Sequence, residues 1–144
     1  MKLTMWLTIG LLLIVSACDA PPSNMTEEIT RQFQSSGRTF VNLAKVVPSA
    51  WDKVCILGPY STSKHAYDTL GFTWPVEVTS SIATSDSVAL LLFVENQEVV
   101  EFVEHPRRDG DFANLSGQCF SREKATFHHL TNPPKGWPGL FPKK

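Results

Sequence analysis

The sequence lacks the short motifs that identify most small enzymes and cofactor-binding proteins. It contains no Gly-x-Ser-x-Gly elbow, no Gly-x-Gly-x-x-Gly or P-loop pattern, and neither the C-x-x-C nor the H-E-x-x-H spacing of zinc sites. No internal repeat is present, and 144 residues suit one domain. We therefore expect no cofactor, and these absences make a small hydrolase the least favoured function.

The sequence also has no excess of basic over acidic residues. The chain has 13 Lys and Arg against 14 Asp and Glu, and residues 18–144 alone carry 12 against 14. Because nucleic-acid-binding domains display a basic face, this balance argues against a nucleic-acid partner.

The apolar run at the start of the chain is short. Residues 3–15 are mostly apolar and follow Lys2. A membrane-spanning helix needs about 20 such residues, whereas thirteen match the hydrophobic region of a signal peptide. The alternatives are an N-terminal core helix and a plain transmembrane anchor, and the length and flanks disfavour both.

The last residue of this apolar run begins the segment Val15-Ser16-Ala17-Cys18, which resembles the lipobox of bacterial lipoproteins. The resemblance implies that residues 1–17 are removed and that Cys18 carries the lipid. Several acyl chains on one residue make a durable membrane anchor. Asp19 resembles the signal that retains lipoproteins in the inner membrane in enteric-type sorting. We expect a lipid-anchored domain in the periplasm, with the inner membrane favoured over the outer.

Only three cysteines are present. With Cys18 lipidated, Cys55 and Cys119 remain as an even pair in an oxidising compartment, which predicts a disulfide between them. The bridge would close a loop of about 65 residues and stabilise the domain by about 4 kcal/mol. Two buried free thiols are the alternative. A cysteine nucleophile is disfavoured because neither residue lies beside a histidine or at a helix start.

The helical signals lie mostly in the first half of the chain. After a tether at residues 18–25, Asn24 and Glu27 form a capping box. Apolar residues then recur at helical spacing as far as Pro48, with Gly37 allowing a kink or two helices. A second, short helix is predicted over residues 64–70, ending at Gly71.

Strand signals predominate later. We predict a first strand at residues 51–57, an edge strand at 74–78, a central strand at 88–94 and a hairpin turn at 95–98 leading into 99–104. A helix is the rival interpretation of 88–94. A last strand within 118–130 places Cys119, Ala125 and Phe127 on one face. The fold class is therefore α+β, with an N-terminal helix or helices packed on a largely antiparallel sheet of about four strands in a single domain, residues 26–132.

Residues 105–111 hold the densest group of charged side chains. His105, Arg107 and Arg108 lie there with two aspartates. Such loops often carry binding residues, and either arginine has the forked geometry that holds a carboxylate or phosphate. The simpler interpretation is a solvated hairpin exit whose charges pair with one another.

Two aromatic residues are further candidate contacts. Tyr60 follows a rigid Gly58-Pro59 corner, and Trp137 lies in the proline-rich tail, residues 133–144, which is expected to lie extended over the domain or to stay mobile. The adjacent His128 and His129 do not predict a metal site, because neighbours on a strand point to opposite faces.

Five segments of the mature domain are similar in order to those of uncharacterised small bacterial lipoproteins, a family without an assigned function. They are Trp51-Asp52-x-Val54-Cys55, Gly58-Pro59-Tyr60, Leu70-Gly71-Phe72-x-Trp74, Glu104-His105-Pro106-Arg107 and Gly117-x-Cys119-Phe120. The resemblance supports the envelope location. The leading hypothesis is a noncatalytic module that binds a periplasmic protein or another envelope component. An inhibitor or immunity protein against a periplasmic hydrolase is the alternative.

Overall fold

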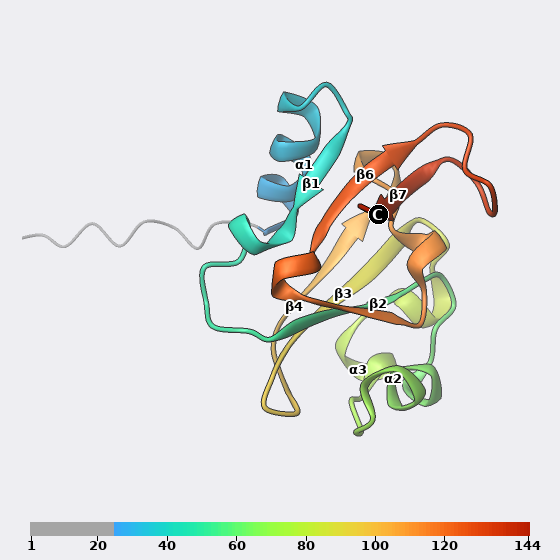
Figure 1. Cartoon of the computed structure of the whole chain (residues 1–144). Coiled ribbons are helices and arrows are strands. Elements are labelled where there is room, and N and C mark those ends of the chain that lie inside the picture. Colours follow the sequence, from blue (N-terminus) through green and yellow to red (C-terminus); the bar gives the residue numbers. More distant parts are fainter. Residues whose placement is uncertain (1–24) are drawn as a thin grey trace, which may run out of the picture.

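The structure, a computed structural model, describes residues 25–144 (Figure 1). Cys18, Asp19 and the capping residue Asn24 lie outside the described residues. The helices are α1 (Met25–Ser35), α2 (Ser63–Leu70) and α3 (Val76–Thr79). The strands are β1 (Phe40–Asn42), β2 (Lys53–Leu57), β3 (Val88–Glu95), β4 (Glu98–Pro106), β5 (Gln118–Ser121), β6 (Thr126–Leu130) and β7 (Gly139–Pro142). Short 3-10 turns are η1 (Leu43–Lys45), η2 (Ile82–Thr84), η3 (Arg107–Asp109), η4 (Ala113–Leu115) and η5 (Arg122–Lys124).

The strands form two antiparallel sheets, which confirms the α+β class. One sheet has four strands in the order β4-β3-β2-β5, and the other has three in the order β1-β6-β7. Only α1 precedes the strands, because α2 and α3 follow β2 in the chain. No helix within residues 25–144 is long and apolar enough to cross a membrane.

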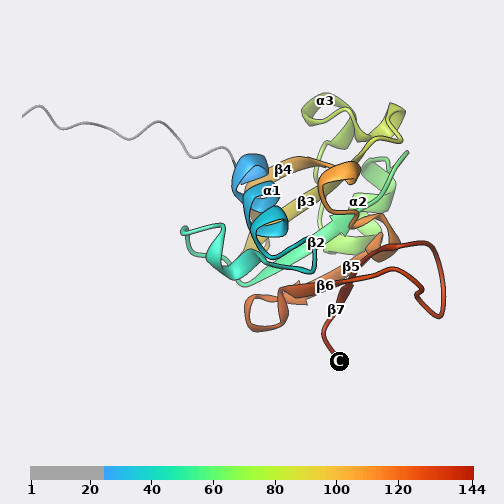
Figure 2. The same ribbon diagram turned by 90° about the horizontal axis from the view of Figure 1, so that it is seen from above.

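The two interior strands of the four-stranded sheet, β2 and β3, are buried on both faces. Leu57, Leu90 and Leu92 pack toward α2 and α3, whereas Ile56 and Leu91 pack toward α1 and the three-stranded sheet. Figure 2 shows α1 lying across this sheet. The predicted central strand is confirmed, since β3 lies between β2 and β4.

The predicted hairpin between β3 and β4 is also confirmed. Asn96 and Gln97 form its turn with φ of +48° and +61°. A two-residue type I′ turn needs positive φ at both positions, and asparagine is among the residues that tolerate this best.

The prediction that helical structure runs on to Pro48 is wrong. The helix ends at Ser35, and Gly37 and Arg38 take the left-handed conformation with φ of +70° and +62°. Residues Phe40–Asn42 then pair with β6 instead. The apolar spacing suited a helix because a short strand followed by a 3-10 turn buries residues at similar intervals.

The predicted edge strand at residues 74–78 is a short helix, α3. Pro75 precedes its first turn, where a missing N–H costs nothing. The N–H of Val76 donates to Ser63 Oγ at 3.0 Å, and the Ser63 N–H donates to the Glu77 carboxylate at 2.9 Å. These bonds tie α3 to the start of α2.

The single strand predicted within residues 118–130 is two strands in different sheets. Between them, in η5, the Arg122 N–H donates to the Asp52 carbonyl at 2.9 Å, and its guanidinium lies over the Trp51 ring. Cys119 consequently does not share a face with Ala125 and Phe127, which are fully buried while Cys119 is exposed.

The disulfide prediction is confirmed. Cys55 on β2 and Cys119 on β5 lie directly opposite each other in the sheet and are bridged. The bridge fastens the edge strand β5 to the interior of the four-stranded sheet.

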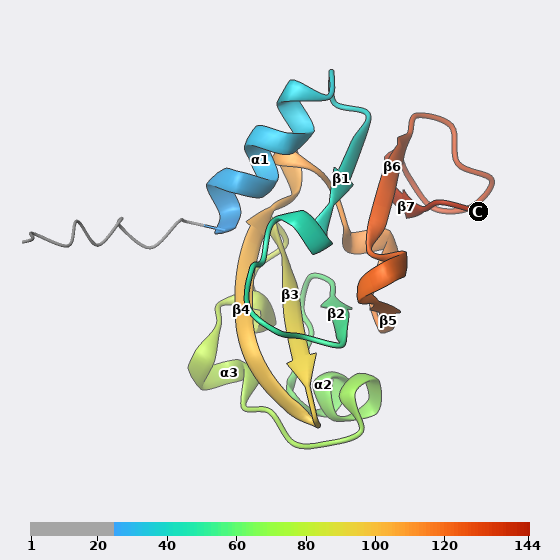
Figure 3. The same ribbon diagram turned by 60° about the vertical axis from the view of Figure 1, so that its left-hand side comes forward.

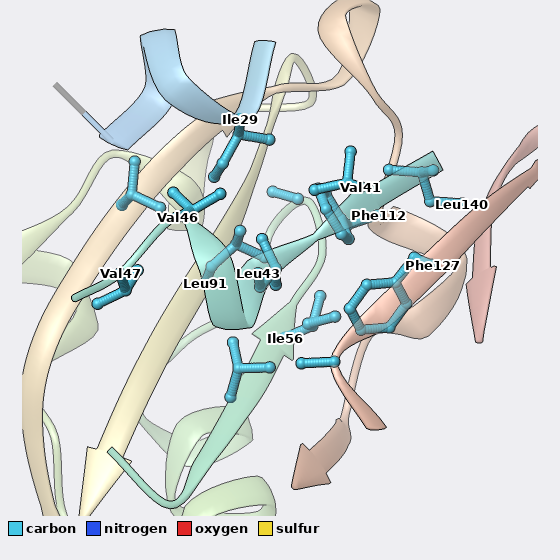
Figure 4. Packing of buried hydrophobic residues seen from close by; sticks show 14 of the residues in the cluster. Ile29, Val41, Leu43, Val46, Val47, Ile56, Leu91, Phe112, Phe127 and Leu140 are labelled. Carbon is cyan, nitrogen blue, oxygen red and sulfur yellow. The ribbon is translucent and has the colours of Figure 1, made fainter. Parts of the chain in front are cut away.

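The proline-rich tail contributes a strand. Residues Gly139–Pro142 pair with β6 as β7, and Leu140 is fully buried. Figure 4 shows Leu140 beside Phe127 and Phe112 in the core between the sheets, together with Ile29 of α1 and Leu91 of β3. One face of the three-stranded sheet therefore completes the core.

Candidate binding site

Three of the five candidate binding residues line one hollow of about 370 Å³. They are Tyr60, Arg107 and Trp137, which come from three distant segments of the chain. We call this hollow the aromatic pocket. Its remaining lining residues are Gly58, Pro59, Asp86, Ala113 and Ser116.

Tyr60 is held in a costly backbone conformation. Its φ is +62°, a left-handed geometry that costs a residue with a side chain about 1 kcal/mol or more. Its N–H donates to the Ile82 carbonyl at 2.9 Å. The preceding corner is fixed by two further bonds, from the Gly58 N–H to Ser116 Oγ at 2.8 Å and from Ser61 Oγ to the Gly58 carbonyl at 2.7 Å. The phenol ring is left 58% exposed at the rim of the pocket.

The Asp111 carboxylate organises the opposite wall. It accepts hydrogen bonds from Arg107 Nε at 3.1 Å and Nη2 at 2.9 Å, and from the indole Nε1 of Trp137 at 2.9 Å. It also accepts the N–H of Ala113 at 2.8 Å. These bonds to Asp111 raise the pKa of Arg107, which therefore stays charged. One carboxylate thus fixes both an arginine and a tryptophan.

The guanidinium of Arg107 is already largely engaged. In addition to the hydrogen bonds to Asp111, Arg107 Nη1 donates to the Asp86 carbonyl at 2.8 Å. The central carbon of the Arg107 guanidinium lies 5.6 Å from the centre of the Trp137 ring. Arg108 similarly lies 3.6 Å from the Asp109 carboxylate. The simpler interpretation of this loop, in which its charges pair with one another, is therefore the one observed.

Trp137 is fixed through its backbone too. Asn114 Nδ2 donates to the Trp137 carbonyl at 2.8 Å, and the Trp137 N–H donates to Asn114 Oδ1 at 3.3 Å. Gly136 has a φ of +86° and lies so close to Asn114 that a side chain at this position would collide with it. The indole is 46% exposed, so the tail presents an immobilised aromatic ring.

The other two candidates lie outside the pocket. His105 is fully buried, with Nε2 3.2 Å from the Asp109 carbonyl and its ring edge-on to Phe112. Its Nδ1 has no hydrogen-bond partner within residues 25–144. Burial lowers the pKa of His105, so the imidazole is neutral near pH 7. The side chain of Arg108 extends into solvent.

Sequence reasoning missed two residues that build the pocket. Asp86 lies in a Ser/Thr-rich segment that shows only the features of a loop, and Asn114 follows no recognisable motif. In the sequence, Asp111 is one of several charged residues between positions 105 and 111. No local pattern reveals these roles, because each depends on contact with a distant segment.

The described residues hold no arrangement of three His, Cys, Asp or Glu side chains suited to a metal ion. His128 and His129 contact different rings, Phe40 and Phe33 respectively. No family model matches the sequence, and neither the curated proteins nor the solved structures contain a match.

Proposed function

We propose that this protein is a membrane-anchored periplasmic lipoprotein whose domain is a noncatalytic binding module, and that the aromatic pocket contacts a partner protein of the cell envelope. The observation that carries this proposal is Tyr60, whose ring is exposed by a backbone conformation that disfavours any side chain. Local strain of this kind persists where surrounding structure holds it, and it concentrates at binding and catalytic sites.

The residue types support a protein partner. Tyrosine, tryptophan and arginine are the residues that contribute most to protein–protein affinity. Because Asp111 and Asn114 already fix Arg107 and Trp137, little side-chain entropy remains to be lost on binding.

The shape of the site favours this function over the inhibitor alternative. An inhibitor that blocks a hydrolase inserts a protruding loop into the cleft of the enzyme, whereas Tyr60, Arg107 and Trp137 line a hollow that receives part of a partner. The hydroxyl of Ser116, also in the pocket, accepts the Gly58 N–H. Within residues 25–144 it has no hydrogen bond to a histidine or carboxylate that would activate it for hydrolysis.

The substitution Tyr60→Gly separates binding from folding. Glycine relieves the left-handed strain, so the free energy of unfolding in urea should stay unchanged or rise by about 1 kcal/mol. Binding should fall, because the exposed ring is lost. The readout is photo-crosslinking in intact envelopes from a benzoylphenylalanine placed at Asp86, an exposed residue of the pocket that accepts the Arg107 hydrogen bond through its backbone carbonyl. It should capture one reproducible protein and lose it when Tyr60→Gly is added.

Tyr67 provides a matched control, since it is a tyrosine of similar exposure, 55%, on α2 and outside the pocket. A benzoylphenylalanine at Tyr67 should not capture that protein, and Tyr67→Gly should leave the crosslink from position 86 intact. Equal capture from both positions, or a crosslink unaffected by Tyr60→Gly, would contradict the proposal.

The anchor is tested at the residues outside the described structure. Cys18→Ala should abolish metabolic labelling by an acyl probe and release the protein from membranes, and continued labelling would refute lipidation at this cysteine. Asp19→Ser should shift the labelled protein toward the outer-membrane fraction in a density gradient. An unchanged distribution would show that Asp19 does not retain it.

A further inference from the structure

The outer face of the three-stranded sheet carries a row of rings. Phe40, His128 and Phe141 are direct partners across β1, β6 and β7, so their side chains lie side by side on the same face. The rings of Phe40 and His128 are 6.0 Å apart. Phe40 is 41% exposed and Leu130, on the same face of β6, is 39% exposed. This face is the opposite one to that which packs Val41 and Phe127 into the core.

Two hollows, of about 720 and 560 Å³, adjoin along this row. They share four lining residues, so they form one continuous depression that we call the sheet groove. The shared residues are His128, Pro142, Lys143 and Lys144.

The sheet groove is basic on a domain that is otherwise acidic. Its lining contains four lysines and one acidic residue, Glu123. The rest of residues 25–144 carry eight Lys and Arg against twelve Asp and Glu. The lysines of the groove are Lys124, Lys135, Lys143 and Lys144. An apolar floor with a basic rim is complementary to a ligand that combines apolar groups with negative charge.

The edges of this sheet cannot accept an added strand. On β7, the Leu140 N–H donates to the Asp111 carbonyl at 2.8 Å, and Pro142 has no N–H. On β1, the N–H groups of Phe40 and Asn42 donate to side chains of α1 and its C-terminal turn, at 3.2 and 2.9 Å. A ligand must therefore bind through its side chains on the sheet face and not by strand addition.

We propose that the sheet groove binds an acidic segment of a partner protein, with apolar side chains on the Phe40–His128–Phe141 row and carboxylates paired with the lysines. A hollow accepts protruding side chains, whereas a bilayer surface is contacted by protruding protein groups. Figure 3 shows β6, β7 and the C-terminus on the opposite side of the domain from the start of α1. This site is distinct from the aromatic pocket and does not depend on its function.

The test uses residues 18–144 with Cys18→Ser and a fluorescent peptide, Glu-Leu-Glu-Phe-Glu-Leu-Glu. The peptide should bind measurably by anisotropy, bind more weakly as salt rises, and perturb the NMR signals of Phe40 and Phe141. The same peptide with lysine in place of glutamate should not bind. The double variant Lys124→Glu/Lys143→Glu should weaken binding by about tenfold or more.

Arg31→Glu/Lys64→Glu is the matched control, because it makes the same change in net charge at exposed sites on α1 and α2. It should change affinity less than about twofold, since screening limits charge effects to within about 10 Å. Urea unfolding of both double variants establishes that each is folded. Tyr60→Gly should leave peptide affinity unchanged, which separates this site from the aromatic pocket.

Three results would overturn the proposal. They are no binding of the acidic peptide, equal weakening by the two double variants, and signal changes outside the groove. Vesicles containing phosphatidylglycerol form the second arm of the experiment. Vesicle binding that requires Lys124 and Lys143, without peptide binding, would replace the proposal with a membrane contact.

Discussion

The two sheets of this domain are covered to different extents. The four-stranded sheet is enclosed by α2 and α3 on one face and by α1 and the second sheet on the other, so the interior residues of β3 are buried on both sides. The three-stranded sheet buries one face and leaves Phe40 and Leu130 exposed on the other. The interior strands of the four-stranded sheet therefore lie wholly within the core, whereas the three-stranded sheet retains an open face for contacts.

The largest expected effect on stability comes from the disulfide, which joins two strands of the four-stranded sheet. Replacing both Cys55 and Cys119 by alanine should lower the free energy of unfolding by about 4 kcal/mol. Urea denaturation checks this, with wild-type protein in dithiothreitol as the control. Equal thiol titration of native protein with and without reductant would show that the cysteines are free.

Two leucines, one from each sheet, test the difference in burial between the sheets. Leu91 on β3 is fully buried, whereas Leu130 on β6 is 39% exposed. Leu91→Ala should cost about 3 kcal/mol, since it leaves a cavity, and Leu130→Ala should cost less than about 1 kcal/mol. If the two variants lost similar free energies of unfolding in urea, Leu130 would have to be buried against another molecule in solution.

The next effect concerns the attachment of the β6–β7 loop. Asp111→Asn weakens the pairing with Arg107 and the hydrogen bond from Trp137, and should cost about 2 kcal/mol. Amide hydrogen exchange in residues 131–138 should accelerate. Asp109→Asn is the control, because its partner Arg108 is exposed and the pair should contribute less than about 1 kcal/mol. Unchanged exchange in Asp111→Asn would mean that the backbone bonds of Asn114 suffice.

The smallest effect near neutral pH comes from His105, which packs beside the core that both sheets share. Burial lowers its pKa in the folded state, so the unfolded chain binds a proton first as pH falls. Its contribution to stability is therefore complete above about pH 6.5 and is lost as pH falls from there through the folded-state pKa, with a slope of at most about 1.4 kcal/mol per pH unit.

The free energy of unfolding should be measured from pH 8 to pH 5 in wild type and in His105→Gln. It should decrease less with falling pH in His105→Gln than in wild type. The hydrogen bond from Ser63 lowers the pKa of Glu77, so the stability that this carboxylate contributes is lost only in more acid solution. An unchanged slope in His105→Gln would show that another group controls this range.

Part of this structure follows from local patterns. The continuous apolar run of β3, the two turn residues of the hairpin, and Gly71 at the end of α2 all act within a few residues. The disulfide was predictable by counting cysteines on the expectation that Cys18 carries a lipid and that the domain folds in an oxidising compartment. The predictions failed at α3, at β1 and within residues 118–130, and in each case a distant segment decided the outcome. Ser63 holds the turn at Val76, β6 pairs with Phe40–Asn42, and Asp52 binds the turn between β5 and β6.

Patterns in the sequence predict the class of the fold, its central hairpin, the pairing of Cys55 with Cys119, and the residue types that are candidates for binding. Which of those candidates come together depends on the folded arrangement of distant segments. Tyr60, Arg107 and Trp137 converge because Asp111 and Asn114 hold the β6–β7 loop against the end of the four-stranded sheet, while His105 is drawn into the core. Periodicity and turn propensity report interactions between near neighbours in the chain, whereas a pocket is made by contacts between segments far apart in it.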